Sequence, residues 1–176
     1  MVKRVVANDK LKPRLQQISA WYEKGGILLI SYNIFQAWVI NDESDKRSKP
    51  LPDDVHQDVK RWLLEGPSII IADEAHKMKN PASKTTVAAM QFRSKSRIAL
   101  TGSPLANNLS EYYTMVNWIS EDYLGKPVEF RANYIEPIEE GVYANSTYAQ
   151  RRKSEAEASV SRLHSRQAAS RLISSS

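Results

Sequence analysis

The stretch Ile69-Ile-Ile-Ala-Asp73-Glu-Ala-His76 decides the fold. Three isoleucines and an alanine make an apolar run of strand length, and two carboxylates follow it directly. Short continuous apolar runs of this kind are typical of strands buried in a parallel sheet. We therefore expect a strand over 68–72 that delivers Asp73 and Glu74 to the carboxyl end of the sheet.

Strand and helix signals alternate on both sides of this stretch. Apolar runs predict further strands over 27–31 and 97–101, and helical periodicity predicts helices over 13–24, 32–40, 53–65, 82–92 and 110–119. Asp53 and Ser110 are expected to cap the helices that begin there. This alternation predicts an α/β fold with a parallel sheet and helices on both faces, in which ligands bind at the carboxyl ends of the strands.

Composition excludes several classes of protein. The 176 residues are 41% hydrophobic, which is enough for one buried core, and contain no cysteine. Disulfides and thiolate metal sites are therefore excluded, and the scattered histidines His56, His76 and His164 rule out a zinc protein. No apolar run approaches the roughly 18 residues that a transmembrane helix needs.

The net charge is +5, and its distribution is uneven. Between residues 75 and 110 every charged residue is positive, namely Lys77, Lys79, Lys84, Arg93, Lys95 and Arg97. Such a stripe could follow a phosphate backbone. A solvated helix face with its adjoining loop is the more common meaning of such a stripe, and charge alone leaves both interpretations open.

The adjacent carboxylates of Asp73 and Glu74 suit nucleotide hydrolysis. In that chemistry the first carboxylate holds Mg²⁺, usually through water, and the second orients and deprotonates the attacking water. An acidic pair after a strand is also common as a helix cap or as loop acids. The pair alone does not decide between these interpretations.

A second polar segment follows the strand expected over 97–101. It reads Leu100-Thr-Gly-Ser-Pro-Leu-Ala-Asn-Asn-Leu109, and it would reach the same edge of the sheet as the acids. The hydroxyls of Thr101 and Ser103 could then meet His76 or the two carboxylates. The alternative is a structural turn built on the Gly-Ser-Pro sequence.

Together these segments resemble the Swi/Snf-related family of helicase-like chromatin remodelling and DNA-translocating ATPases, within superfamily two. Gly26-Ile-Leu-Leu-Ile-Ser31-Tyr32 is similar to that family's motif Ib, residues 73–76 to its motif II, and residues 100–109 to its motif III. The run Trp21-Tyr-Glu-Lys-Gly-Gly26 is most similar to the ATRX-like branch. The resemblance implies a partial, incomplete RecA-like parallel sheet.

The resemblance also implies ATP and Mg²⁺ as cofactors, double-stranded DNA or nucleosomes as partners, and a nuclear location. It assigns Asp73, Glu74 and His76 to catalysis, with Asp73 as the Mg²⁺ residue. The residues expected to couple nucleotide state to DNA binding are Thr101, Gly102, Ser103 and Pro104. The residues expected to contact DNA phosphates are Ser31, Tyr32, Lys79, Asn107 and Asn108.

Two departures from the family pattern qualify these expectations. The first is Ala106, which stands where the family more often has glutamine. The neighbouring Thr101-Gly-Ser-Pro104 keeps the family pattern and differs from the Ser-Ala-Thr of DEAH-box RNA helicases, which favours DNA over RNA as the partner. The second departure is a missing loop. No Gly-x-x-x-x-Gly-Lys-Ser/Thr loop, the usual phosphate cradle, occurs in the 176 residues.

The missing loop predicts that residues 1–141 are the back half of the first ATPase lobe. The family resemblance implies that the N-terminal part of that lobe, with the loop, lies upstream of residue 1, and that a second RecA-like lobe lies downstream of residue 176. Residues 142–176, rich in Ser, Ala, Arg and Glu, are expected to form a truncated helical C-terminal extension. We expect the isolated chain to be inactive. The alternative is a catalytically dead module that binds DNA or a protein, or a gene remnant.

Overall fold

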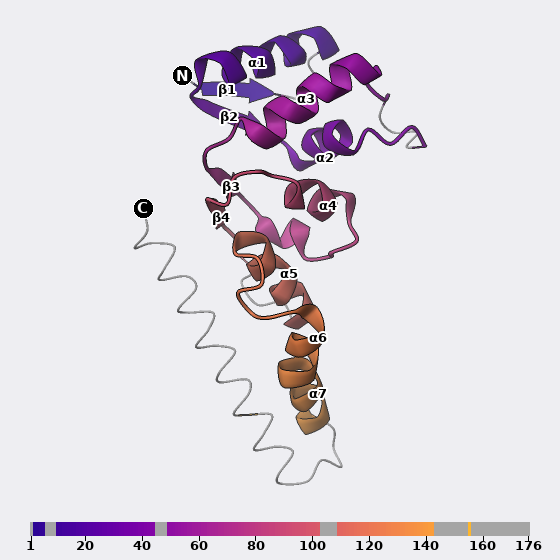
Figure 1. The fold of residues 1–176 in the computed structure, drawn as a ribbon, viewed down its shortest axis with the longest axis vertical. Coiled ribbons are helices and arrows are strands. Elements are labelled where there is room, and N and C mark those ends of the chain that lie inside the picture. The colour runs from indigo at the N-terminus through magenta and orange to yellow at the C-terminus, as the bar shows by residue number, and fades with distance from the viewer. Residues whose placement is uncertain (1, 6–9, 45–48, 103–108, 143–154, 156–176) are drawn as a thin grey trace. The chain divides into compact units, whose positions relative to one another are not determined.

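The computed structural model describes residues 2–5, 10–44, 49–102, 109–142 and 155 (Figure 1). The chain forms two compact units, residues 1–102 and residues 103–176. Four expected site residues, Ser103, Pro104, Asn107 and Asn108, lie outside the described residues, as does nearly all of the expected C-terminal extension.

The strands of the first unit pair in parallel. Strand β1 (Val2–Val5) pairs with β2 (Ile27–Ile30), with Val2 opposite Ile27. Strand β3 (Ile70–Ala72) pairs with β4 (Arg97–Ala99), with Ile70 opposite Arg97. The predicted α/β fold with parallel strands is confirmed, and β1 is an addition that the sequence did not predict.

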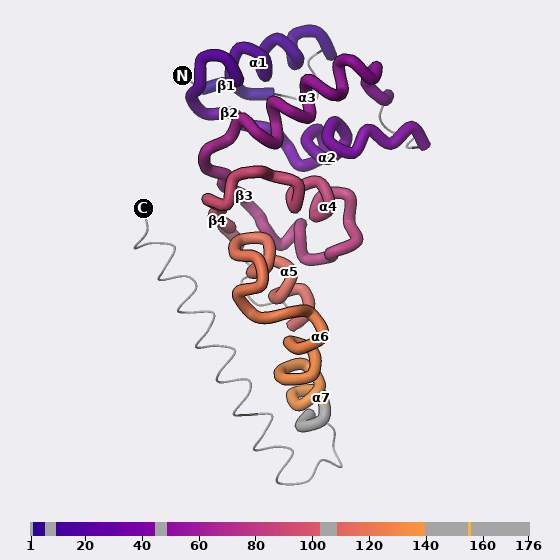
Figure 2. The backbone as a smooth tube through the Cα atoms, viewed as in Figure 1, coloured from indigo at the N-terminus to yellow at the C-terminus, as the bar shows by residue number. Residues whose placement is uncertain are grey.

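Four α-helices accompany these strands: α1 (Leu11–Lys24), α2 (Tyr32–Ile40), α3 (Asp53–Glu65) and α4 (Lys84–Met90). Helix α1 packs on β1 and α3, and α2 packs on α3 and α4, as the path of the backbone shows (Figure 2). Their apolar stripes form the core, in which Ile18, Val39 and Val59 are almost fully buried. A 3₁₀ turn, η1 (Ala75–Met78), follows β3.

Two of the predicted helix caps are wrong. Helix α3 has Pro52 at its N-cap, so Asp53 lies in the first turn, where its charge still favours the positive end of the helix dipole. The helix expected from Ser110 begins at Leu109. The helix expected over 82–92 is shorter, because Ser83 caps α4 by accepting a hydrogen bond from the Thr86 N–H.

Strands β2 and β3 are buried on one face rather than on both. Ile27 and Leu29 of β2 are 59% and 51% exposed, and Ile71 of β3 is 61% exposed. Their neighbours Leu28, Ile30 and Ala72 are less accessible, which is the alternation of a half-covered sheet. An apolar strand face is therefore accessible in the first unit.

In the second unit, α5 (Leu109–Ile119) is followed by α6 (Pro127–Phe130), a π-helical turn (Arg131–Ile135) and α7 (Glu136–Val142). A small core gathers around Tyr113, Phe130 and Ile135. In the described residues of both units, no helix is long and apolar enough to cross a membrane.

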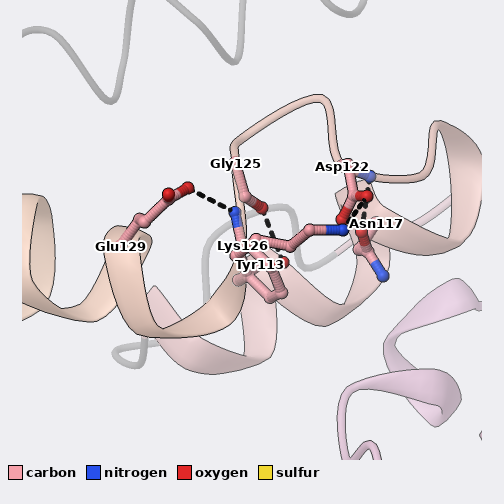
Figure 3. Close-up of polar contacts among 6 residues, drawn as sticks. All are labelled: Tyr113, Asn117, Asp122, Gly125, Lys126 and Glu129. Carbon is pink, nitrogen blue, oxygen red and sulfur yellow. Dashed lines mark hydrogen bonds and ion pairs between the residues drawn. The ribbon is translucent and has the colours of Figure 1, made fainter.

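Polar contacts fix the turn between α5 and α6 (Figure 3). The Tyr113 hydroxyl donates to the Gly125 carbonyl oxygen at 2.9 Å, and the Asp122 N–H donates to the Asn117 side chain at 2.9 Å. The Glu129 carboxylate accepts from the Lys126 N–H at 2.9 Å, and the Lys126 ammonium pairs with Asp122. Gly125 has φ +78°, a conformation that favours glycine.

Candidate active site

The end of β3 is tied to the end of β4 on both sides of the acidic pair. The Leu100 N–H donates to the Ala72 carbonyl oxygen at 2.8 Å, and the Ala75 N–H donates to the Leu100 carbonyl oxygen at 2.9 Å. Asp73 and Glu74 therefore form a two-residue corner whose flanking residues are held by the same residue, Leu100. Thr101, expected from the sequence to adjoin the acids, follows Leu100 directly.

The backbone at Glu74 is strained. Glu74 has φ +53° and ψ +48°, the left-handed region, which costs a non-glycine residue about 1–2 kcal/mol. Local hydrogen bonds accompany it: the Glu74 N–H donates to Asp73 Oδ1 at 3.0 Å, and the Lys77 N–H donates to the Glu74 carbonyl oxygen at 3.0 Å. Strain of this kind is concentrated at functional sites.

The carboxylates of the corner are accessible. Both Asp73 and Glu74 are exposed, and Glu74 Oε2 lies 3.2 Å from His76 Nδ1. That nitrogen is buried and is not aligned for a hydrogen bond with its neighbour. Residues 73, 74 and 76, which the sequence singled out together, are thus adjacent in the structure.

The corner suits Mg²⁺ bound together with a phosphate ligand. Within the described part of the chain, no group of three or more acidic or histidine side chains could hold a metal ion by itself. Mg²⁺ is usually bound by one or two carboxylates together with waters and substrate phosphates. The exposed carboxylate of Asp73 fits that role.

Tyr32 approaches the corner from another element. Its hydroxyl donates to the Asp73 carbonyl oxygen at 2.8 Å, and the Lys77 ammonium lies 5.7 Å from the centre of its ring. Burial, and then the charges of Asp73 and Glu74, raises the pKa of the Tyr32 phenol to about 12. Sequence reasoning gave Tyr32 a role with DNA and missed this contact, because no local pattern links residues so far apart.

The remaining described candidates are less closely connected to the acids. The Ser31 hydroxyl accepts from the Ile34 N–H at 3.4 Å and so caps α2. Lys79 is exposed just beyond η1, Thr101 is half-buried, and Gly102 is exposed. The structure brings Tyr32 to the acidic corner, whereas Ser31 and Lys79 stand at the ends of neighbouring elements.

The stripe of positive residues proves to be divided. Arg97 is only 5% exposed, and its guanidinium donates to the carbonyl oxygens of Phe92 at 2.6 Å and Ser94 at 2.9 Å. The Lys84 ammonium lies 2.8 Å from Asp42 Oδ2, whereas Lys77 and Lys79 remain exposed. Arg97 has a structural role, so the stripe as a whole does not follow one surface.

The fold is that of an α/β protein with an accessible acidic pair at the carboxyl ends of parallel strands, which is where ligands bind in such folds. Residues 1–172 match the family described as the SNF2-related domain. The chain therefore belongs to the SNF2-related, or Swi/Snf, family.

Curated relatives agree with this assignment. The chain is 41% identical over 134 residues to "Protein CHROMATIN REMODELING 20" of Arabidopsis thaliana, covering 76% of this chain and 9% of the relative. It is 38% identical over 134 residues to "Transcriptional regulator ATRX" of Homo sapiens, covering 76% of this chain and 5% of the relative. It is 32% identical over 163 residues to "Helicase ARIP4" of Homo sapiens, covering 81% of this chain and 11% of the relative. These relatives support the ATRX-like branch, and the chain matches only a small part of each.

Proposed function

We propose that this chain is part of an ATP-dependent translocase that moves on duplex DNA and remodels nucleosomes in the nucleus. The observation that supports this most directly is the acidic corner, held between two hydrogen bonds to Leu100 at the point where β3 ends. The names of the relatives, which refer to chromatin remodelling, transcriptional regulation and a helicase, agree with it.

Asp73 and Glu74 divide the chemistry between them. Asp73 would hold Mg²⁺, and the ion, when bound, would neutralise charge on the phosphates of ATP. Glu74 orients the attacking water and takes its proton. His76, whose ring lies beside Glu74, completes the catalytic set.

Coupling and DNA contact belong to the neighbouring elements. The state of the nucleotide is linked to DNA binding by the segment that follows Leu100, the residue bonded on both sides of the acidic pair. This segment comprises Thr101, Gly102, Ser103 and Pro104. The DNA phosphates are contacted by Ser31, Tyr32, Lys79, Asn107 and Asn108. Ser31 and Tyr32 open α2, whose N-terminal amide groups favour an anion.

The isolated chain is inactive in this proposal. Residues 1–141 are the back half of the first ATPase lobe, and residues 142–176 are an extension that follows it. The 176 residues contain no Gly-Lys-Ser/Thr phosphate loop, so ATP binding depends on the preceding part of the lobe and hydrolysis on a second RecA-like lobe.

The test is ATP hydrolysis by the natural polypeptide that contains these residues, measured with and without duplex DNA. Duplex DNA should stimulate hydrolysis, and Asp73→Asn should abolish it, whereas Asp58→Asn, an exposed acid on α3, should not. Hydrolysis that Asp73→Asn leaves intact would contradict the proposal. DNA binding without any hydrolysis by the wild type would favour a catalytically dead binding module.

A further inference from the structure

The peptide group between Asp73 and Glu74 is held at both of its polar atoms. Its carbonyl oxygen accepts from the Tyr32 hydroxyl at 2.8 Å, and its N–H donates to Asp73 Oδ1 at 3.0 Å. The second bond is local to Asp73, whereas the first comes from α2, which lies 41 residues earlier in the chain. Rotating this peptide group would break both bonds.

The orientation of this peptide group sets φ of Glu74. Glu74 occupies the left-handed region, with φ +53°, which a glutamate leaves readily unless its surroundings hold it there. The flanking bonds of Ala72 and Ala75 to Leu100 fix the ends of the corner, but neither involves the peptide group between the acids. The Tyr32 hydroxyl is therefore well placed to keep the Glu74 backbone, and with it the carboxylate, in one orientation.

We infer that Tyr32 is a positioning residue for Glu74, and that its hydroxyl acts through the Asp73 carbonyl oxygen rather than on a DNA phosphate. A carbonyl and a phosphate oxygen both need a donor, and a phenol has one proton to give. This inference rests on the proposed function, because it assigns a role to Tyr32 in the hydrolysis attributed to Glu74.

The surroundings of Tyr32 keep its donor in place. The titratable groups that face the phenol are the carboxylates of Asp73 and Glu74, with the Lys77 ammonium near its ring. An ordinary phenol has a pKa of about 10, so the hydroxyl carries its proton at neutral pH. The link also joins the start of α2, where Ser31 is proposed to contact DNA, to the acidic corner.

The experiment compares Tyr32→Phe with Tyr22→Phe in the natural polypeptide that contains these residues. Tyr22 is an exposed tyrosine on α1, so its substitution controls for the loss of a hydroxyl. Hydrogen exchange is followed by mass spectrometry in the segment 72–78. In parallel, kcat and KM for ATP and the affinity for duplex DNA are measured.

We expect Tyr32→Phe to increase deuterium uptake in the segment 72–78 and to lower kcat by up to about 10²-fold, which is the cost of misplacing a catalytic group by about 1 Å. DNA affinity and KM for ATP should change by less than about twofold. Tyr22→Phe should behave as wild type. If Tyr32→Phe lowers the melting temperature, a second variant, Tyr32→4-aminophenylalanine, retains a hydrogen-bond donor. This variant should return both the deuterium uptake of the segment 72–78 and kcat to their wild-type values.

Three outcomes overturn the inference. With an active wild type, unchanged uptake or unchanged kcat in Tyr32→Phe contradicts the positioning role alone and leaves the proposed function standing. Weaker DNA binding with an unchanged kcat at saturating DNA would make Tyr32 a phosphate ligand instead. If the wild type hydrolyses no ATP with DNA, there is no base to position, and the inference fails together with the proposed function.

Discussion

The Ala75 N–H donates to the Leu100 carbonyl oxygen at 2.9 Å, which ties the residue after the acidic pair to the residue before Thr101. A shift of the segment that begins at Thr101 therefore pulls directly on the catalytic corner. In the proposed function, this backbone connection would be the physical route by which DNA contact near Thr101 alters hydrolysis at Glu74.

Thr101→Val should lower the stimulation of ATP hydrolysis by duplex DNA more than it lowers the basal rate. Valine keeps the shape of threonine but removes the hydroxyl proposed for coupling. The measurement is the ratio of the rates with and without DNA, and Ser120→Ala, at the exposed end of α5, is the control. An unchanged ratio in Thr101→Val would contradict the coupling role.

Lys79→Ala should weaken binding to every duplex sequence equally. A phosphate contact carries no sequence information, so its loss reduces the slope of log affinity against log salt by about 1. Titrations between about 50 and 200 mM salt would measure it. Lys126→Ala, an exposed lysine paired with Asp122, is the control, and an unaltered slope in Lys79→Ala would remove Lys79 from the DNA surface.

Lys84→Met should raise the pKa of Asp42. Hydrogen bonds from Lys84, and then from Ser44, lower this pKa from 3.8 to about 2. Because the folded-state pKa lies below the ordinary value, the stabilisation is present above pH 3.8 and is lost as the pH falls toward 2. Carboxylate NMR of Asp42 gives the pKa, with Lys60→Met as the control, and an Asp42 pKa that stays near 2 would show that Lys84 is not its cause.

Ile18→Ala should destabilise the first unit by about 2–5 kcal/mol, and Ile18→Val by about 1 kcal/mol. Ile18 on α1 is 0% exposed, so the truncation leaves a cavity in the core. Val87→Ala, at a position 44% exposed on α4, should cost far less. Denaturant unfolding measures the three values, and equal losses at Ile18 and Val87 would contradict this core.

The sequence predicted the elements better than their boundaries. Continuous apolar runs such as Ile69-Ile-Ile-Ala identified strands, but β1 was missed because Lys3 and Arg4 interrupt its apolar pattern. Asp53 was expected as a cap because its residue type favours that position, yet Pro52 occupies it. Which of two adjacent residues becomes the N-cap depends on where the tertiary packing starts the helix, and the local sequence does not contain that information.

The candidate site could be predicted only in part, for a similar reason. The acids 73 and 74 are adjacent in sequence, so their meeting at the end of a strand follows from the strand itself. The left-handed backbone of Glu74 has no signal in its residue type, and the contact between Tyr32 and Asp73 is a tertiary relationship between residues 41 apart. A pattern read along the chain has no access to either feature.

The most direct test of this account is the substitution Glu74→Gln in the natural polypeptide, assayed with saturating ATP, Mg²⁺ and duplex DNA. Loss of a general base lowers a rate by about 10²–10⁴, so the account predicts a fall of that size with ATP and DNA binding retained. Glu43→Gln, an exposed glutamate beyond α2, should keep the wild-type rate. A Glu74→Gln variant that hydrolyses ATP at the wild-type rate would contradict the account.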